Sequence, residues 1–523
     1  MKKKVAIMRT RNKTSILVPL IVGVLALDLF AFGLIPQPQQ MKRKGGEFEI
    51  PGQSVEEVAK SATFERDVTV QPEGYAISVT EKGITVRCSD EPGAFYAVKT
   101  LEQLGRKTEK GTVVFPTVEI NDWPAFRWRG VMLDEARHFF GKEVVMRLLD
   151  LMAAYKYNVL HWHITDDQGW RIEIKQYPEL VKYGSVRPCS VKYDTNAFYK
   201  EQHKPLFYYN NEKYGPYFYE QEDIKEIVAY AKARHIKVVP EIELPGHVRA
   251  LLAAHPEFSC KGETLARIPR CAWSIEDDVL CAGNDEALVF FKNILDEVCE
   301  LFPSDVIHIG GDECPKVRWE KCEKCKARIK AEGLSGTKDL QAWIASYFAR
   351  HLSKRGRRTA GWDEILNGDV PKSAIGMCWR MSSSAGAGDA LVTPQLAAAR
   401  GYDVIVALSP YCYLSRNQGL PDDPYPYYTY TNPLSLQKAY SFDPLAGLNE
   451  SESRHVIGSQ ACVWSESIWC VFDLEWKMWP RALALAEVMW TYPKDRDYAE
   501  FRARAAKQRS RLIKKRVNCA PLD

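Results

Sequence analysis

The sequence lacks a strong excess of charge of either sign. Its formal net charge is +4 over 523 residues, and much of the excess of lysine and arginine lies at the two ends of the chain. There is no basic stripe of the kind that binds nucleic acid, so we expect no nucleic-acid partner. The composition is that of a globular protein, and the length suits two or three domains.

Long hydrophobic runs are also missing, except near the N-terminus. Six Lys/Arg within residues 1–13 precede an apolar stretch at 16–27, and Ala31 and Gly33 put small residues where a signal peptidase cleaves. We predict a signal peptide over residues 1–33 and export to the periplasm or the exterior. A retained membrane anchor is disfavoured, because Asp28 interrupts a run that is too short to span a bilayer comfortably. No cysteine precedes Cys88, which excludes lipidation at the cleavage site.

Cysteine, in contrast, is present at 14 positions, which is less typical of an exported protein. Two groups of three are close in sequence, namely Cys260, Cys271 and Cys281 in a loop-like insertion, and Cys314, Cys322 and Cys325 in a segment that ends in C-x-x-C. For the first group, the sequence does not decide whether a disulfide forms within the insertion. The second group fits a structural zinc with a fourth ligand from elsewhere, although a disulfide or free thiols are favoured.

The most informative segment is 305–313, DVIHIGGDE. It predicts a short buried strand, a Gly-Gly break, and then two adjacent carboxylates, Asp312 and Glu313. Neighbouring side chains of a strand point to opposite faces, so the pair can share one task only if the backbone turns, which glycine permits. The carboxyl end of a buried strand is where α/β enzymes place an acid and a charge stabiliser. The alternative is a solvated pair at the start of a loop.

The segment 34–123 predicts a small α+β domain without a catalytic role. Alternating apolar residues indicate strands at 75–80, 83–88 and 112–120, and a helical period indicates a helix at 93–104. Polar residues are scattered through this segment, so its expected role is packing.

From residue 124 to residue 495 the pattern is that of a (β/α)₈ TIM barrel. Eight apolar, β-rich runs occur at 128–133, 158–164, 237–242, 305–309, 358–362, 374–379, 403–408 and 456–463. Helical patterns between them occur at 142–155, 221–235, 285–301, 339–355 and 394–400, and a final one at 477–489 covers the eighth strand. The fifth and sixth strands are too close for a full helix, so we expect one reduced helix. Residues 496–523, with a basic helix at 498–517, should pack on the barrel.

The predicted strand ends carry carboxylates and aromatic residues from all eight strands. Aromatic rings stack on the apolar faces of sugars, and Asp, Glu and Arg bind sugar hydroxyls. A single tryptophan at a strand end is more often a core residue, but convergence on one rim points to a carbohydrate. The residues are Asp134, Arg137, His138, Asp166, Asp167, Trp170, Glu241, Glu243, His247, Asp312, Glu313, Trp362, Asp363, Glu364, Trp379, Tyr411, Tyr413, Trp464 and Glu466.

Six ordered motifs then match a known family. The chain resembles the family 20 glycoside hydrolases, the β-N-acetylhexosaminidases, and most closely the exported bacterial members. The resemblance covers about residues 34–495. The matching stretches are EARHFF (135–140), HWHITDDQGWR (161–171), PEIELPGH (240–247), HIGGDE (308–313), GWDE (361–364) and QACVWSE (460–466).

The resemblance implies an exo-acting, retaining hydrolase that removes terminal, non-reducing, β-linked N-acetylglucosamine or N-acetylgalactosamine from an oligosaccharide or glycoconjugate. The 2-acetamido oxygen of the substrate would attack the anomeric carbon and form an oxazolinium intermediate. Glu313 would be the general acid and then the base, and Asp312 would hold the acetamido N–H. No cofactor and no catalytic metal are implied.

The resemblance also assigns the remaining site residues. Asp166 and His247 would form a relay behind Glu313. Arg137 would bind the 3- and 4-hydroxyls, Tyr413 the acetamido carbonyl, and Glu466 the 4- and 6-hydroxyls. The walls of the pocket would be Trp362, Trp379 and Trp464.

Two departures from the family pattern affect the rim. Ser415 stands where the family usually has Asp or Asn, which should weaken the grip on the outer hydroxyls. No tryptophan lies between Tyr413 and Trp464, and the tyrosines of 425–430 are a candidate substitute. A non-catalytic glycan binder is disfavoured because both carboxylates are present. Release of a disaccharide, an extended site lined by 181–219, the preferred sugar and the oligomeric state stay open.

Overall fold

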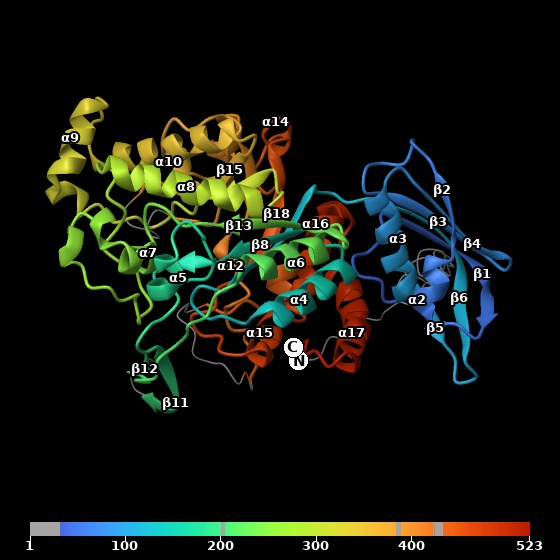
Figure 1. Cartoon of the computed structure of the whole chain (residues 1–523). Coiled ribbons are helices and arrows are strands. Elements are labelled where there is room, and N and C mark those ends of the chain that lie inside the picture. Colours follow the sequence, from blue (N-terminus) through green and yellow to red (C-terminus); the bar gives the residue numbers. More distant parts are fainter. Residues whose placement is uncertain (1–31, 200–203, 383–388, 422, 424–431, 523) are drawn as a thin grey trace, which may run out of the picture.

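The computed structural model describes residues 32–199, 204–382, 389–421, 423 and 432–522. Figure 1 shows two units, a small domain of blue strands on the right and a larger barrel on the left. The predicted signal peptide lies almost wholly outside the described residues and stays a prediction. Among the described helices, none combines the length and the apolar character that crossing a bilayer requires.

The small domain is a six-stranded sheet with helices packed on it, as the sequence predicts for this segment. The strand order is β1-β6-β3-β4-β2, with β5 paired to β6. One face of β3 buries Tyr75, Ile77 and Val79, which is the alternation visible in the sequence. The sequence did not predict β1, α2, β2 or β5, because β1 and β2 are largely exposed and lack that alternation. The elements are β1 (Gln40–Pro51), α2 (Val55–Lys60), β2 (Thr63–Arg66), β3 (Tyr75–Thr80), β4 (Gly83–Cys88), α3 (Glu91–Leu104), β5 (Arg106–Lys107) and β6 (Thr112–Asp122).

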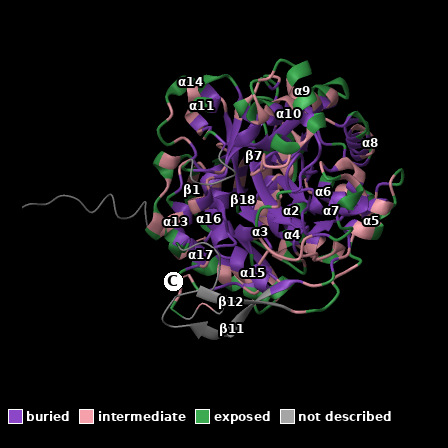
Figure 2. Cartoon of the chain, turned by 90° about the vertical axis from the view of Figure 1, so that its left-hand side faces the viewer, coloured by how far each residue is buried: buried purple, intermediate pink, exposed green. Residues whose placement is uncertain are grey.

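The barrel is closed by eight parallel strands in sequence order, which confirms the predicted fold class. Its strands are buried at the centre of the molecule, and the helices around them are exposed on their outer faces (Figure 2). The strands are β7 (Trp128–Asp134), β8 (Val159–His163), β13 (Lys237–Glu241), β14 (Val306–His308), β15 (Arg358–Trp362), β16 (Ile375–Cys378), β17 (Asp403–Val406) and β18 (Val456–Val463). The outer helices are α4 (Lys142–Ala154), α6 (Gln221–Lys232), α8 (Asp285–Leu301), α10 (Thr337–Lys354) and α11 (Pro394–Ala399).

Between β15 and β16 the chain forms only the 3₁₀ turn Asp363–Asn367, as the short spacing predicts. The prediction of one helix at 477–489 is wrong about where the helix begins. Two helices occur there, α15 (Val471–Met478) and α16 (Arg481–Trp490), because Pro480 lacks the N–H that a continuous helix needs. Shorter elements in the connections are β9 (Thr165–Asp166), β10 (Gly169–Trp170), α5 (Glu179–Gly184), β11 (Val191–Tyr199), β12 (Lys204–Tyr209), α7 (Arg249–Ala254), α9 (Glu323–Ala331), α12 (Ser409–Cys412), α13 (Leu436–Tyr440) and α14 (Glu450–Ser453).

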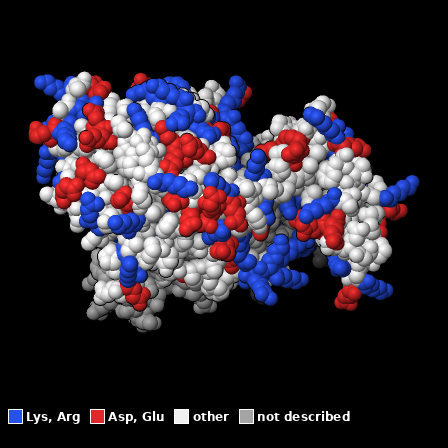
Figure 3. Space-filling view, viewed as in Figure 1, with Lys and Arg blue, Asp and Glu red and all other residues white. Residues whose placement is uncertain are grey.

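The last helix, α17 (Tyr498–Lys514), contacts both units. Its Gln508 donates to the side chain of Gln103 on α3 (2.9 Å) and accepts from the hydroxyl of Tyr155, which follows α4 (3.2 Å). The helix therefore packs on the barrel and also holds the small domain against it. On the face shown in Figure 3, acidic and basic side chains are interspersed over most of the surface.

Candidate active site

The two carboxylates of the HIGGDE motif follow a turn whose backbone angles favour glycine. Gly310 and Gly311 have φ of 64° and 98°, in the left-handed region. A Cβ on Gly310 would lie 1.7 Å from a carboxylate oxygen of Glu243, so this position also needs the missing side chain. Glu313 itself has φ of 47° and His247 has φ of 51°, conformations that are uncommon outside glycine. The backbone is thus strained at two predicted site residues.

Asp312 and Glu313 converge on one histidine. The Nε2 atom of His247 lies 3.7 Å from Asp312 Oδ2 and 3.6 Å from Glu313 Oε2. The side chain of Asp312 is 11% exposed and that of Glu313 is 26% exposed, so Glu313 is the more accessible of the two to a leaving group or to water. Burial raises the pKa of Asp312 to about 7, against the opposing charge of His247, and the neighbouring Glu313 carboxylate adds to the rise.

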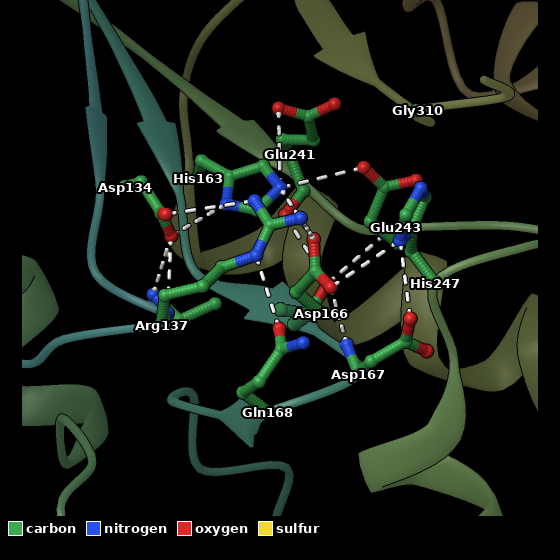
Figure 4. A network of polar contacts seen from close by, with 12 residues as sticks. Asp134, Arg137, His163, Asp166, Asp167, Gln168, Glu241, Glu243, His247 and Gly310 are labelled. Carbon is green, nitrogen blue, oxygen red and sulfur yellow. Dashed lines mark hydrogen bonds and ion pairs between the residues drawn. The ribbon is translucent and has the colours of Figure 1, made fainter. Parts of the chain in front are cut away.

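His247 is held from behind by two aspartates (Figure 4). Its Nδ1 lies 3.2 Å from Asp167 Oδ2 and 3.4 Å from Asp166 Oδ1. Burial lowers the pKa of His247, but the carboxylates of Asp166 and Asp312 outweigh burial and hold that pKa well above its usual range. The predicted pair of Asp166 and His247 is therefore in contact. Asp167, to which the sequence analysis gave no role, is the second partner of the histidine.

Arg137 is fixed by three side chains at the edge of this network (Figure 4). Its guanidinium donates to Gln168 Oε1 (3.0 Å) and pairs with Asp166 (2.8 Å) and Asp134 (3.5 Å). Burial lowers the pKa of Arg137, but the charges of Asp166, Asp134 and then Glu466 hold it well above the ordinary value. Glu466 thus lies near enough to Arg137 to act on it electrostatically.

Four aromatic side chains from different strands form a continuous series of contacts that reaches Arg137. The ring of Trp464 lies 5.7 Å from that of Trp362 and 6.0 Å from that of Tyr413. Tyr413 is stacked with Trp379 at 6.3 Å with an interplanar angle of 10°. The Cζ atom of Arg137 lies 5.0 Å from the centroid of Trp464. The structure therefore brings the predicted aromatic wall together with the predicted hydroxyl-binding arginine.

The floor of the site is a buried network that the sequence analysis did not assign. His161 and His308 each lie 2.9 Å from the carboxylate of Glu241, which also accepts from the indole of Trp362 (2.8 Å). The signal for this network was the alternation in His161-Trp162-His163, because residues two apart on a strand share a face. His161, Glu241 and His308 are close enough to one another to hold a metal ion.

The two departures from the family pattern, Ser415 and the tyrosines of 425–430, have different outcomes. Ser415 is fully buried, and its hydroxyl has no hydrogen-bond partner within the described part of the chain, so it does not lie on the rim. The tyrosines of 425–430 lie outside the described residues.

A closed parallel barrel with this constellation at its strand ends has known counterparts. Residues 126–493 match the glycosyl hydrolase family 20 catalytic domain, and residues 53–123 match domain 2 of the same family. The chain belongs to glycosyl hydrolase family 20. The family that the motifs predicted, its barrel and the preceding small domain are confirmed.

Several relatives of this family-20 chain are known. A β-hexosaminidase of Porphyromonas gingivalis is 38% identical over 83% of this chain and 52% of the relative, so the chain spans about half the length of that protein. A β-hexosaminidase of Akkermansia muciniphila is 31% identical over 92% of this chain and 91% of the relative. A solved GH20 exo-β-N-acetylglucosaminidase of Vibrio harveyi, in complex with N-acetylglucosamine, has a TM-score of 0.81 and 29% identity, covering 94% of this chain and 79% of that one.

Proposed function

We propose that this family-20 enzyme removes single terminal, non-reducing, β-linked N-acetylglucosamine or N-acetylgalactosamine residues from oligosaccharides or glycoconjugates. The reaction retains the anomeric configuration and uses the 2-acetamido group of the substrate as nucleophile. The names of its relatives support the substrate class, and the site supports the mechanism. We also propose that the enzyme is exported, on the basis of the N-terminal sequence pattern alone.

One observation carries the mechanism. Asp312 Oδ1 is buried and has no hydrogen-bond partner among the described residues. A buried, unpaired carboxylate oxygen is costly unless a ligand completes it, and an acetamido N–H supplies the missing donor. Ionised Asp312 then stabilises the positive charge that develops as the acetamido oxygen closes on the anomeric carbon.

Glu313 protonates the leaving glycosidic oxygen and afterwards activates the attacking water. The Nε2 atom of His247 lies 3.6 Å from Glu313 Oε2, so an imidazolium there acts on this carboxyl group by its charge. When Glu313 gives up its proton, the cationic histidine stabilises the carboxylate that forms, and Asp166 and Asp167 in turn stabilise the histidine. The buried chain of charges therefore adjusts the proton affinity of the acid without contacting the sugar.

The remaining residues explain recognition of one terminal sugar. Arg137 and Glu466 lie at the polar edge and bind outer hydroxyls, which only a non-reducing terminus presents. Trp362, Trp379 and Trp464 enclose the apolar face and the acetamido methyl, and Tyr413 binds the acetamido carbonyl.

Glu313→Gln tests the acid–base assignment. Turnover of a terminal β-N-acetylglucosaminide should fall by roughly 10²–10⁴-fold or more, because general acid–base help serves both steps. The matched control is Glu320→Gln, an exposed glutamate seven positions further along the same loop, which should keep native turnover. Near-native turnover in Glu313→Gln would remove this assignment.

Substrate choice and stereochemistry test the nucleophile. Terminal β-glucosides and β-galactosides without the acetamido group should be nearly inert, and proton NMR should show the β-anomer as first product. A thiazoline mimic of the cyclic intermediate should bind far more tightly than the product sugar. A covalent glycosyl-enzyme trapped with a fluorosugar and seen by mass spectrometry would contradict the proposal. A panel that includes lacto-N-biose separates monosaccharide from disaccharide release.

A further inference from the structure

Four cysteines from two distant segments meet beside the barrel. Cys260 and Cys281 flank the long loop between α7 and α8, and Cys322 and Cys325 lie at the start of α9. Sγ–Sγ distances are 3.8 Å for Cys260–Cys325, 3.7 Å for Cys281–Cys322 and 3.7 Å for Cys281–Cys325. All four sulfurs lie within 4.8 Å of one another. Cys314, which the sequence grouped with Cys322 and Cys325, is not part of this four-cysteine cluster.

These distances have the size that one tetrahedral ion imposes. A zinc–sulfur bond of about 2.3 Å places tetrahedral ligands about 3.8 Å apart. A disulfide joins one sulfur to one other at about 2.05 Å, whereas Cys281 and Cys325 each approach two other sulfurs at nearly equal distance.

We propose that Cys260, Cys281, Cys322 and Cys325 bind one Zn²⁺ ion in a closed structural site. Four thiolates fill the tetrahedral shell of zinc, so the ion has no open position for water or substrate. The proposed site is distinct from the catalytic carboxylates and gives the metal no part in the hydrolysis. It also revises the expectation that disulfides or free thiols account for these cysteines.

The zinc site joins the two loops that carry the catalytic groups. Leu280, next to Cys281, donates its N–H to the carbonyl of Pro245 (3.0 Å), two residues before His247. The indole of Trp319 donates to the carbonyl of Leu280 (2.9 Å), and Trp319 lies between Glu313 and Cys322. The ion thus fixes the segment after Glu313 against the segment that supports His247. This consequence for catalysis rests on the proposed function, whereas binding of the metal does not.

The first test measures metal in the purified full-length enzyme. Elemental analysis by plasma mass spectrometry should give one zinc per chain, and a mercurial thiol reagent should release it to a colorimetric chelator. Cobalt substituted for zinc should give the intense visible absorption of a tetrahedral tetrathiolate. Brief EDTA treatment should leave both zinc and activity in place, because the site is closed.

Variants at one ligand separate zinc from a disulfide. Cys322→Ser should lose the zinc and melt at a lower temperature, whereas Cys322→His should keep one zinc, since imidazole replaces thiolate in such sites. Cys299→Ser is the control, because Cys299 is buried on α8 outside the cluster, and it should also keep one zinc. A disulfide would be lost equally in Cys322→Ser and Cys322→His.

Measurements on the native enzyme decide the proposal even if a variant fails to fold. Absence of stoichiometric zinc with all four thiols free would overturn it. So would two disulfides located among these four cysteines by peptide mass spectrometry, or iron in place of zinc. Because zinc content is read without a substrate, these outcomes are independent of whether the proposed hydrolysis is correct.

Discussion

At the scale of single residues, Asp312 is the clearest case of a side chain whose environment lowers the stability of the free protein and favours the reaction. The carboxylate is buried among other carboxylates, and burial raises its pKa to about 7. One of its oxygens has no partner among the described residues. Such an arrangement is unfavourable in the free protein and becomes favourable when a ligand donates to the oxygen and charge develops nearby.

Asp312→Asn should change both thermal stability and turnover. The pKa of Asp312 is about 7 in the folded chain and about 3.9 when unfolded, so the folded state binds the proton more tightly. The protonated Asp312 carboxyl therefore adds to the free energy of unfolding. This contribution is complete below about pH 4 and is lost as pH rises to about 7. The Asn variant escapes this loss, so its melting temperature relative to the native enzyme should rise between about pH 4 and about pH 7 and stay level above that. Its turnover should fall on the order of 10²–10³-fold.

Differential scanning fluorimetry of both proteins across this pH range, with turnover measured in parallel, tests this prediction. A difference in melting temperature that does not change with pH would contradict the raised pKa.

At the scale of elements, the turn after β14 places the acid pair. Strand β14 is short, and Gly310 and Gly311 reverse the chain so closely that Glu243, from the loop after β13, fills the space where a side chain would stand. The turn and the neighbouring carboxylate are therefore one packed unit. Any atom added at Gly310 displaces Glu243 or the catalytic loop.

Gly310→Ala should lower turnover much more than the free-energy cost of its left-handed backbone conformation explains. Left-handed backbone costs a non-glycine residue roughly 1–2 kcal/mol. The control is Gly356→Ala, which has a similar φ of 70° but no atom within 4 Å of the added Cβ, against 1.7 Å at Gly310. Both variants should lose similar backbone stability, but only Gly310→Ala should lose turnover, by about 10²-fold, because a displacement near 1 Å misaligns the acid.

Steady-state kinetics and thermal melting of the two variants separate these effects. Equal turnover in Gly310→Ala and Gly356→Ala would show that the close contact with Glu243 does not position the acid.

At the scale of the whole molecule, a buried ion pair joins the small domain to the barrel. Lys156, between α4 and β8, pairs with Asp122 at the end of β6 (3.0 Å) and donates to the hydroxyl of Tyr75 (2.6 Å). Asp122 also accepts from the indole of Trp490 on α16 (2.8 Å). All four side chains are buried, so separating the two units would expose or unpair these groups together.

We therefore expect the two units to unfold together and to depend on this pair. Lys156→Met leaves Asp122 buried without its cation and should cost about 3–5 kcal/mol. The double variant Lys156→Met/Asp122→Asn removes both charges and should recover much of the loss. Urea unfolding followed by tryptophan fluorescence and far-UV circular dichroism should give coincident transitions. Two separate transitions in the native enzyme would contradict coupling through this interface.

The sequence by itself determined the order and nature of the main elements. Strong periodicity located all eight barrel strands and the missing helix, because a buried strand or an amphipathic helix must bury one continuous face whatever surrounds it. Motif spacing put Asp312, Glu313, Arg137 and the tryptophans at strand ends, and a closed parallel barrel brings such ends to one rim.

Only the tertiary structure decided which of these residues touch. Asp167 shares His247 with Asp166, and Cys260 and Cys281 meet Cys322 and Cys325 instead of Cys314. These partners are far apart in sequence, and local periodicity carries no information about contacts between different loops. Such contacts depend on how the strand connections fold over the barrel, which only the packed molecule fixes.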